Sequence, residues 1–221
     1  MNAIDYNDIP EFDQKRFNKL FSKKRLEKEI KDLENAEEDD LVKSLILTNK
    51  VMHGFKTMLD FYKRLARKDL TESQFKKLLK GFISFTKKIT SYANQLYQLV
   101  KKEEHLGKEL IKKINNKKYY NPQKGFIDTP TEYKGYRLEE ELYDIERSVF
   151  YILDGLRTEE DEFNDYFDSY SDNPQKRKED VERHVKYLKE RDLWIWVYHK
   201  IKQPLLWAIH TVELMKKDHE W

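Results

Sequence analysis

Apolar residues between Phe75 and Val100 recur at steps of three or four residues over almost four heptads, and this spacing constrains the fold most strongly. It is the period of an amphipathic α-helix that buries one stripe of side chains. Thr71 and Gln74, three residues apart just before the stripe, match a capping box and predict where the helix begins. The stripe consists of Phe75, Leu79, Phe82, Ile89, Ala93, Leu96 and Val100.

Similar stripes occur within residues 41–62 and 138–152. Glycine and proline, which interrupt helices, number only 6 and 5 in 221 residues. Charged residues make up 38% of the chain, mostly Lys and Glu, which are good helix formers. The sequence therefore predicts an all-α fold, an elongated antiparallel bundle of five to six helices.

We expect one helical-bundle domain, at residues 12–221, after a flexible N-terminal arm at residues 1–11. Its predicted parts are a first helix at 13–35, a basic helical hairpin at 41–118, a loop at 115–135, acidic helices at 136–170 and an aromatic C-terminal helix at 174–217. The helix of the hairpin that starts near Thr71 could continue past Gly107. Gly155 is expected to end or break a helix, and Pro204 to kink the last one.

Charge is distributed unevenly, although the net charge is only +2. Residues 41–118 hold 19 Lys or Arg and 6 Asp or Glu, which gives +13. Residues 137–172 hold 3 basic and 13 acidic residues, which gives −10. The basic hairpin and the acidic helices are therefore distinct electrostatic regions, and a function is expected along that division.

A ridge of lysines is predicted on the helix that begins near Thr71, opposite its apolar stripe. Such a ridge could follow the phosphate backbone of a nucleic acid, or another polyanion, through non-specific electrostatics, and nearby tyrosines could stack on bases. The candidate binding residues are Lys76, Lys77, Lys80, Lys87, Lys88, Lys101 and Lys102, followed by Lys117, Lys118, Tyr119 and Tyr120 of the loop.

Two other interpretations stay open for the charged segments. The lysines could be an ordinary solvated helix face, and the acidic segment 137–172 could lie beside them and neutralise or shield them. The aromatic C-terminal helix could simply pack in the core. Alternatively, Trp196 and Trp207, which lie off its main apolar face, could form an interface for a protein partner or a second copy.

One motif resembles a ribonuclease family, the HEPN domains, which are all-α bundles carrying an Arg and a His separated by four to six residues. Arg177 and His184 have six residues between them, whereas Arg191 and His199 have seven and depart from the pattern. The resemblance implies a metal-independent ribonuclease in which the histidine acts as acid and base and the arginine stabilises phosphate charge.

The chain has no cysteine, which excludes disulfides, thiolate metal sites and cysteine nucleophiles. It has no glycine-rich phosphate loop, no nucleophile elbow and no paired Glu-x-x-His motif. We therefore expect a non-enzymatic binding or scaffold protein of the cytoplasm, with no metal, cofactor, small-molecule substrate or membrane span. Nucleic acid or another polyanion is the leading partner, and the alternatives are a HEPN-like ribonuclease and a pure protein-interaction or homodimerising module.

Overall fold

The computed structural model describes residues 22–34, 39–65, 67, 69–116, 130–169, 175–176, 179, 183 and 193–217. These residues are almost entirely helical and contain no strand. The helices are α2 (Lys23–Glu34), α3 (Asp40–Leu65), α4 (Glu72–Lys102), α5 (Leu106–Asn116), α6 (Pro130–Ser169), α8 (Leu193–Val197) and α9 (Gln203–Lys217), with a π-helical turn, η2 (Tyr198–Lys202), between the last two.

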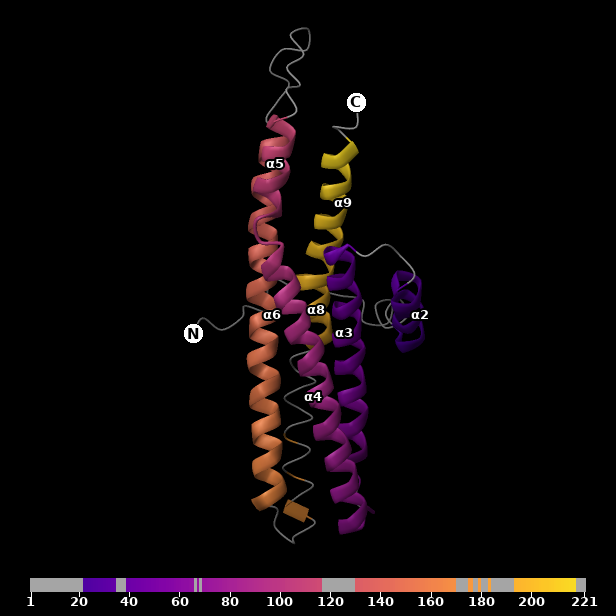
Figure 1. Ribbon diagram of the computed structural model, residues 1–221. Coiled ribbons are helices and arrows are strands. Elements are labelled where there is room, and N and C mark those ends of the chain that lie inside the picture. Colours follow the sequence, from indigo (N-terminus) through magenta and orange to yellow (C-terminus); the bar gives the residue numbers. More distant parts are fainter. Residues whose placement is uncertain are drawn as a thin grey trace.

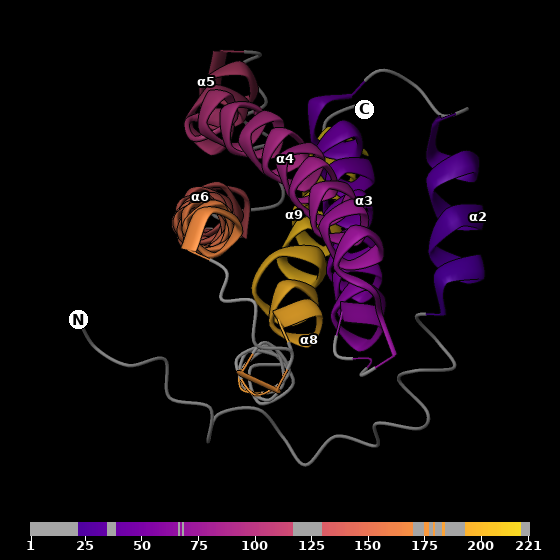
Figure 2. The same ribbon diagram turned by 90° about the horizontal axis from the view of Figure 1, so that it is seen from below.

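The helices lie side by side around one core, as Figure 1 and the view along the bundle in Figure 2 show. Helix α3 packs on α4, α4 on α6, α6 on α9, and α9 on α3, so the contacts close a ring. The chain runs in alternating directions through α3, α4, α6 and the α8–α9 rod (Figure 1). The all-α antiparallel bundle that the sequence predicts is confirmed, and its described part is an up-and-down four-helix bundle.

Two helices extend this bundle. Helix α2 packs against α3, on the side of α3 that faces away from α6 (Figure 2). Helix α5 follows α4 after a turn at residues 103–105 and packs on α6. The possible continuation of the α4 helix past Gly107 is therefore wrong in detail, because Glu103 caps α4 and a new helix begins at Leu106.

Helix α4 begins and packs as the sequence predicts. Thr71 is its N-cap, with its hydroxyl accepting from the Gln74 backbone N–H while the Gln74 side chain accepts from the Thr71 N–H. This pair satisfies two backbone donors that a helix start leaves open. Every residue of the predicted stripe is buried, and Phe82, at the centre of the core, has no exposed surface.

Helix α6 is longer than expected. The predicted end at Gly155 is wrong, because α6 continues through it from Pro130 to Ser169. A glycine inside a helix costs only about 1 kcal/mol relative to alanine. Leu153 and Leu156 on either side of Gly155 are buried in the core, and this packing outweighs so small a penalty.

The irregularity expected at Pro204 takes the form of the π-helical turn η2. The Gln203 N–H donates to the carbonyl of Tyr198, five residues earlier, instead of four. The wider turn precedes a proline that has no N–H and whose ring would clash with a regular preceding turn. Pro204 then occupies the second position of α9, directly after this turn.

A buried ion pair joins α2 to the π-helical turn. Lys202 is 2% exposed, and its Nζ lies 2.7 Å from Oε1 of Glu29 in α2. Burial lowers the pKa of Lys202, and the Glu29 carboxylate opposes that shift. On the neighbouring turn of α2, Glu27 Oε1 lies 3.2 Å from Nε2 of His53 in α3. Together with the fully buried Leu26, these contacts hold α2 on the bundle.

Candidate polyanion-binding surface

The outer face of α4 is rich in lysine and almost free of carboxylates. Between Ser73 and Lys102 there is no Asp or Glu in 30 residues, although the chain has 41 acidic residues in 221. Glu72 is the one acidic residue of the helix. The exposed residues of α4 are Glu72, Ser73, Gln74, Lys76, Lys77, Lys80, Ser84, Lys87, Lys88, Ser91, Asn94, Gln95, Gln98, Lys101 and Lys102. Apart from Glu72, they carry the amides, hydroxyls and ammonium groups that proteins use to contact phosphates.

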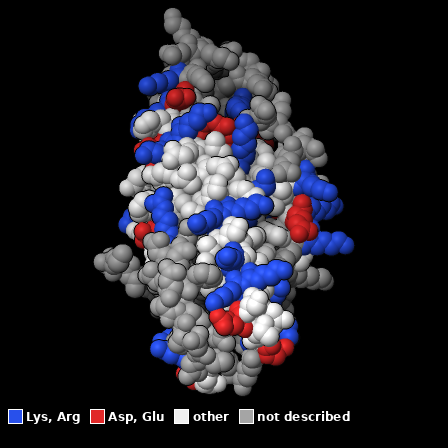
Figure 3. Space-filling view, turned by 60° about the horizontal axis from the view of Figure 1, so that its bottom comes forward, with Lys and Arg blue, Asp and Glu red and all other residues white. Residues whose placement is uncertain are grey.

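All seven lysines that the sequence places on this ridge are exposed in the structure. Ion pairs with other described residues form at Lys76, with Glu72 one turn earlier, and at Lys102, with Asp40 of α3. Within the described part of the chain, Lys77, Lys80, Lys88 and Lys101 form no ion pair, which leaves their ammonium groups available to an anion. Figure 3 shows lysine and arginine side chains spread over one face of the molecule, where they cover more surface than the acidic side chains among them.

Helix α3 adds a lysine to this surface. The Nζ atoms of Lys50 in α3 and Lys88 in α4 lie 5.8 and 5.9 Å from the centroid of the Tyr92 ring. The face of an aromatic ring attracts cations, so Tyr92 contacts two ammonium groups at the junction of the two helices. Further along α4, Lys101 Nζ lies 5.6 Å from the Tyr97 ring centroid. Such paired positive charges favour an anion with more than one phosphate.

A basic pocket opens where α3 ends and α4 begins. Its volume is about 400 Å³, and it is lined by Phe61, Arg64, Arg67, Leu70, Gln74, Lys77, Leu78 and Gly81. Arg64 lies over the Phe61 ring at 5.9 Å, and Phe61 in turn packs on Phe82 and Phe85 of α4. Asp69 pairs with Arg67 and offsets part of the positive charge. The pocket thus combines an apolar floor with three cationic side chains at its rim.

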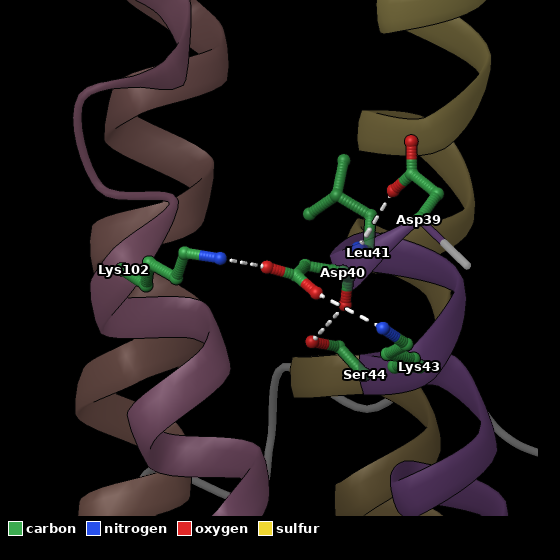
Figure 4. A network of polar contacts seen from close by, with 6 residues as sticks. All are labelled: Asp39, Asp40, Leu41, Lys43, Ser44 and Lys102. Carbon is green, nitrogen blue, oxygen red and sulfur yellow. Dashed lines mark hydrogen bonds and ion pairs between the residues drawn. The ribbon is translucent and has the colours of Figure 1, made fainter.

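An acidic network marks the opposite end of this surface (Figure 4). The Asp40 carboxylate pairs with Lys102 and lies 3.6 Å from Lys43 Nζ. The hydrogen bond from Lys102, supported by the charges of both lysines, lowers the pKa of Asp40. Asp39 Oδ1 accepts from the Leu41 N–H at 2.8 Å and caps α3. These carboxylates end the lysine-rich stretch at Lys102.

Several predicted site residues have no structural test. Those outside the described residues are Lys117, Lys118, Tyr119 and Tyr120 of the loop, and Arg177 and His184 of the motif that resembles HEPN domains. Of the two tryptophans, Trp196 is 7% exposed and packs in the core, so it presents little surface to a partner. Trp207 is half-buried, with the Arg137 guanidinium 5.1 Å above its ring.

Sequence reasoning missed the contribution of α3 and the basic pocket. Lys50, Arg64 and Tyr92 join the surface only because α3 and α4 pack side by side. The available signal was the position of Lys50 and Arg64 on a helix that was itself predicted to pair with α4. Among the described residues, no group of three or more His, Asp or Glu side chains could hold a metal ion. In the same part of the chain, no helix has the length and apolar character that a membrane crossing requires.

The fold and its basic face define a class of protein, a small antiparallel helical bundle with one cationic side. Comparison with known proteins does not narrow that class further. The sequence matches no family model, and neither curated proteins nor solved structures give a significant match to it.

Proposed function

We propose that this protein binds nucleic acid through the surface formed by α3 and α4. The observation that supports the proposal best is the outer face of α4, with seven lysines and a single carboxylate in a helix of 31 residues. A helix of that length spans roughly 46 Å, enough to follow a nucleic-acid backbone over several phosphates. The Lys50–Tyr92–Lys88 arrangement supplies an aromatic ring between two cations, a combination suited to contacts with phosphates and bases.

The acidic helix bears on this proposal because α6 packs directly beside α4. Its carboxylates could lower the affinity of the lysines for a polyanion, so shielding by residues 137–172 stays a prediction. On the α6 side, the fully exposed carboxylates Glu140, Asp144 and Asp154 are equal in number to the exposed arginines Arg137, Arg147 and Arg157. The charges of these six fully exposed residues balance, while the partly exposed Glu139, Glu141 and Glu146 add negative charge to α6.

The test is a binding titration of the full chain with fluorescently labelled single-stranded RNA, single-stranded DNA and duplex DNA at several salt concentrations. Each lysine that contacts a phosphate contributes roughly 0.7–0.9 to the slope of log K against log salt. The double variant Lys80→Gln/Lys88→Gln should therefore reduce that slope by roughly 1.5 and weaken binding to every sequence alike. The matched control is Lys24→Gln/Lys28→Gln, two exposed lysines on α2, which should change neither quantity.

Two results would contradict the proposal. Absence of binding at low salt would do so, and so would equal loss of affinity in the α4 and α2 variants. Heparin serves as a comparison polyanion, because binding to heparin without binding to nucleic acid would assign the surface to another ligand. Electrophoresis of the RNA after incubation addresses the ribonuclease alternative, in which His184→Ala would abolish cleavage.

A further inference from the structure

The outer face of α6 exposes aromatic side chains at heptad spacing. Tyr136, Tyr143 and Phe150, each seven residues after the one before, are 56%, 54% and 50% exposed. Among the described residues, four of the five large hydrophobic side chains with such exposure lie on α6, the fourth being Tyr151. Exposed apolar groups gathered on one face of a helix mark an interaction surface more often than chance.

Charged residues complete a regular seam between these aromatics. Glu140, Arg147 and Asp154 each lie four residues after one aromatic and three before the next seam position, and Arg157 ends the series. All of them are exposed. Alternating steps of three and four residues are the spacing of a coiled-coil seam. The core stripe of α6 is separate from the seam and consists of Leu138, Leu142, Ile145, Val149, Ile152 and Leu156.

We propose that this seam pairs with the same seam of a second copy of the chain, in antiparallel orientation. The pairing is centred between Ser148 and Val149. Glu140 then faces Arg157 of the second copy, Tyr143 faces Asp154, and Arg147 faces Phe150. Each contact occurs twice because of the two-fold symmetry. The three contacts are an ion pair, a hydroxyl-to-carboxylate hydrogen bond and a cation–π contact, so these three layers of the seam are complementary.

The next register along the seam is less favourable. Centred on Ile145, it would place Glu140 opposite Phe150, where a carboxylate meets the negative face of an aromatic ring. In the favoured register, the side chains of Arg147 and Phe150 are already ordered by contacts within their own chain. The Arg147 guanidinium lies 5.8 Å from the Tyr151 ring and its Nε donates to the Tyr151 hydroxyl at 3.3 Å. Phe150 packs against Tyr97 of α4 and against Tyr151, both at 6.4 Å.

Charge distinguishes a second copy from other occupants of this face. A nucleic acid stacking on the aromatics would meet as many exposed carboxylates (Glu140, Asp144 and Asp154) as arginines, so this face offers a polyanion no net attraction. A second copy instead places each seam carboxylate opposite an arginine or a tyrosine hydroxyl. The inference is independent of nucleic-acid binding by α4, since it uses different residues and a different partner.

Sedimentation of the full chain between roughly 1 and 200 µM tests the pairing by charge reversal. Glu140→Arg and Arg157→Glu should each weaken dimerisation at least tenfold, because each places like charges in opposite layers. The double variant Glu140→Arg/Arg157→Glu restores the pair with its signs exchanged and should recover the parent association to within about threefold. Glu213→Arg, an exposed reversal on α9, is the matched control and should leave association unchanged. Circular dichroism establishes that each variant is folded.

Disulfide cross-linking tests the register of the pairing. Because the chain has no cysteine, each introduced cysteine can react only with another introduced cysteine. A mixture of the Tyr143→Cys and Asp154→Cys proteins should form a mixed disulfide faster than a mixture of Tyr143→Cys and Arg147→Cys. Faster cross-linking in the second mixture would overturn the register. A chain that stays monomeric throughout, or a double variant no better than the single ones, would overturn the pairing itself. If the parent chain is itself monomeric and Tyr143→Ser/Phe150→Ser still lowers its nucleic-acid affinity, the face is assigned to nucleic acid instead.

Discussion

Two glycine-to-alanine substitutions should change stability in opposite directions. Gly107 of α5 and Gly135 of α6 lie where the two helices approach most closely. A Cβ atom on Gly107 would lie 2.0 Å from the Gly135 carbonyl oxygen and 2.9 Å from Glu139 Cγ. Gly155 lies inside α6, and a Cβ atom there meets nothing within 4 Å. The substitution of alanine for glycine therefore creates a steric clash at Gly107. At Gly155 it only increases helix propensity.

The size of each effect follows from these distances. A carbon and a carbonyl oxygen in contact stay about 3.3 Å apart, so Gly107→Ala must separate the helices by roughly 1.3 Å. Overpacking of this kind costs about 1–3 kcal/mol, and the gain in helix propensity returns at most about 1 kcal/mol. Gly155→Ala receives that gain with no clash. The two variants should thus differ by about 2 kcal/mol in free energy of unfolding, with Gly107→Ala the less stable.

Thermal and urea unfolding followed by far-ultraviolet circular dichroism measure this difference. For a chain of this size, about 2 kcal/mol corresponds to roughly 4–8 °C in melting temperature. Hydrogen exchange of residues 106–116 locates the loss, since separation of the helices also strains the 2.8 Å contact between Lys108 and Glu139. The reasoning is refuted if Gly107→Ala is as stable as the parent chain, because the close approach of α5 and α6 would then not exist.

Three further substitutions test the contacts that hold the helices. Glu29→Gln should destabilise the fold by about 1–2 kcal/mol in urea, because it removes the carboxylate that lies 2.7 Å from the buried Lys202 ammonium, whereas Lys202→Met should cost little. Asp40→Asn should lower the melting temperature near neutral pH, where the ionised carboxylate pairs with Lys102. Because folding lowers the pKa of Asp40, this difference is full above pH 4 and disappears as the pH falls through the folded pKa. Thr71→Ala should cost about 1 kcal/mol in thermal unfolding and Thr71→Ser little, since serine also caps helices.

Each of the three has an outcome that contradicts it. Equal destabilisation by Glu29→Gln and Lys202→Met would mean that packing, and not the loss of the Glu29–Lys202 ion pair, determines the loss of stability. A pH-independent effect of Asp40→Asn would exclude the ion pair as its cause. Equal stability of Thr71→Ala and Thr71→Ser would show that the capping box contributes nothing to α4.

The parts of the fold that the sequence predicts well are those with local causes. The α4 stripe and the capping box at Thr71 depend on residues a few positions apart, and both are confirmed. The predicted end of the helix at Gly155 is wrong because contacts with other helices, which are not local in sequence, decide the outcome there. A local helix-breaking signal of about 1 kcal/mol competes there with burial of Leu153 and Leu156 against other helices, which sequence spacing alone does not weigh.

The candidate polyanion-binding surface likewise has a part that the sequence predicts and a part that depends on how the helices pack. The lysines of α4 could be assigned to one exposed face because the helical period alone determines it. The contact of Lys50 with Tyr92 and the pocket beside Arg64 depend on how α3 lies against α4. Burial of Lys202 depends on α2 as well. Such contacts require the arrangement of three helices in space, which a charge count along the chain does not contain.

The sequence suggests a basic hairpin beside an acidic helix, but the structure shows a more detailed distribution of charge. On α6, the exposed arginines and carboxylates between Arg137 and Arg157 balance and form a seam that complements itself. In an antiparallel pair, the two-fold axis is perpendicular to the plane of the two paired helices. An element that flanks one helix therefore has its symmetry copy on the same side of that plane. Since α4 packs on one flank of α6, both α4 helices would lie on the same side of the dimer. Pairing through α6 would therefore present two carboxylate-poor lysine faces to one polyanion and raise its affinity by effective concentration, which connects the two proposals through geometry.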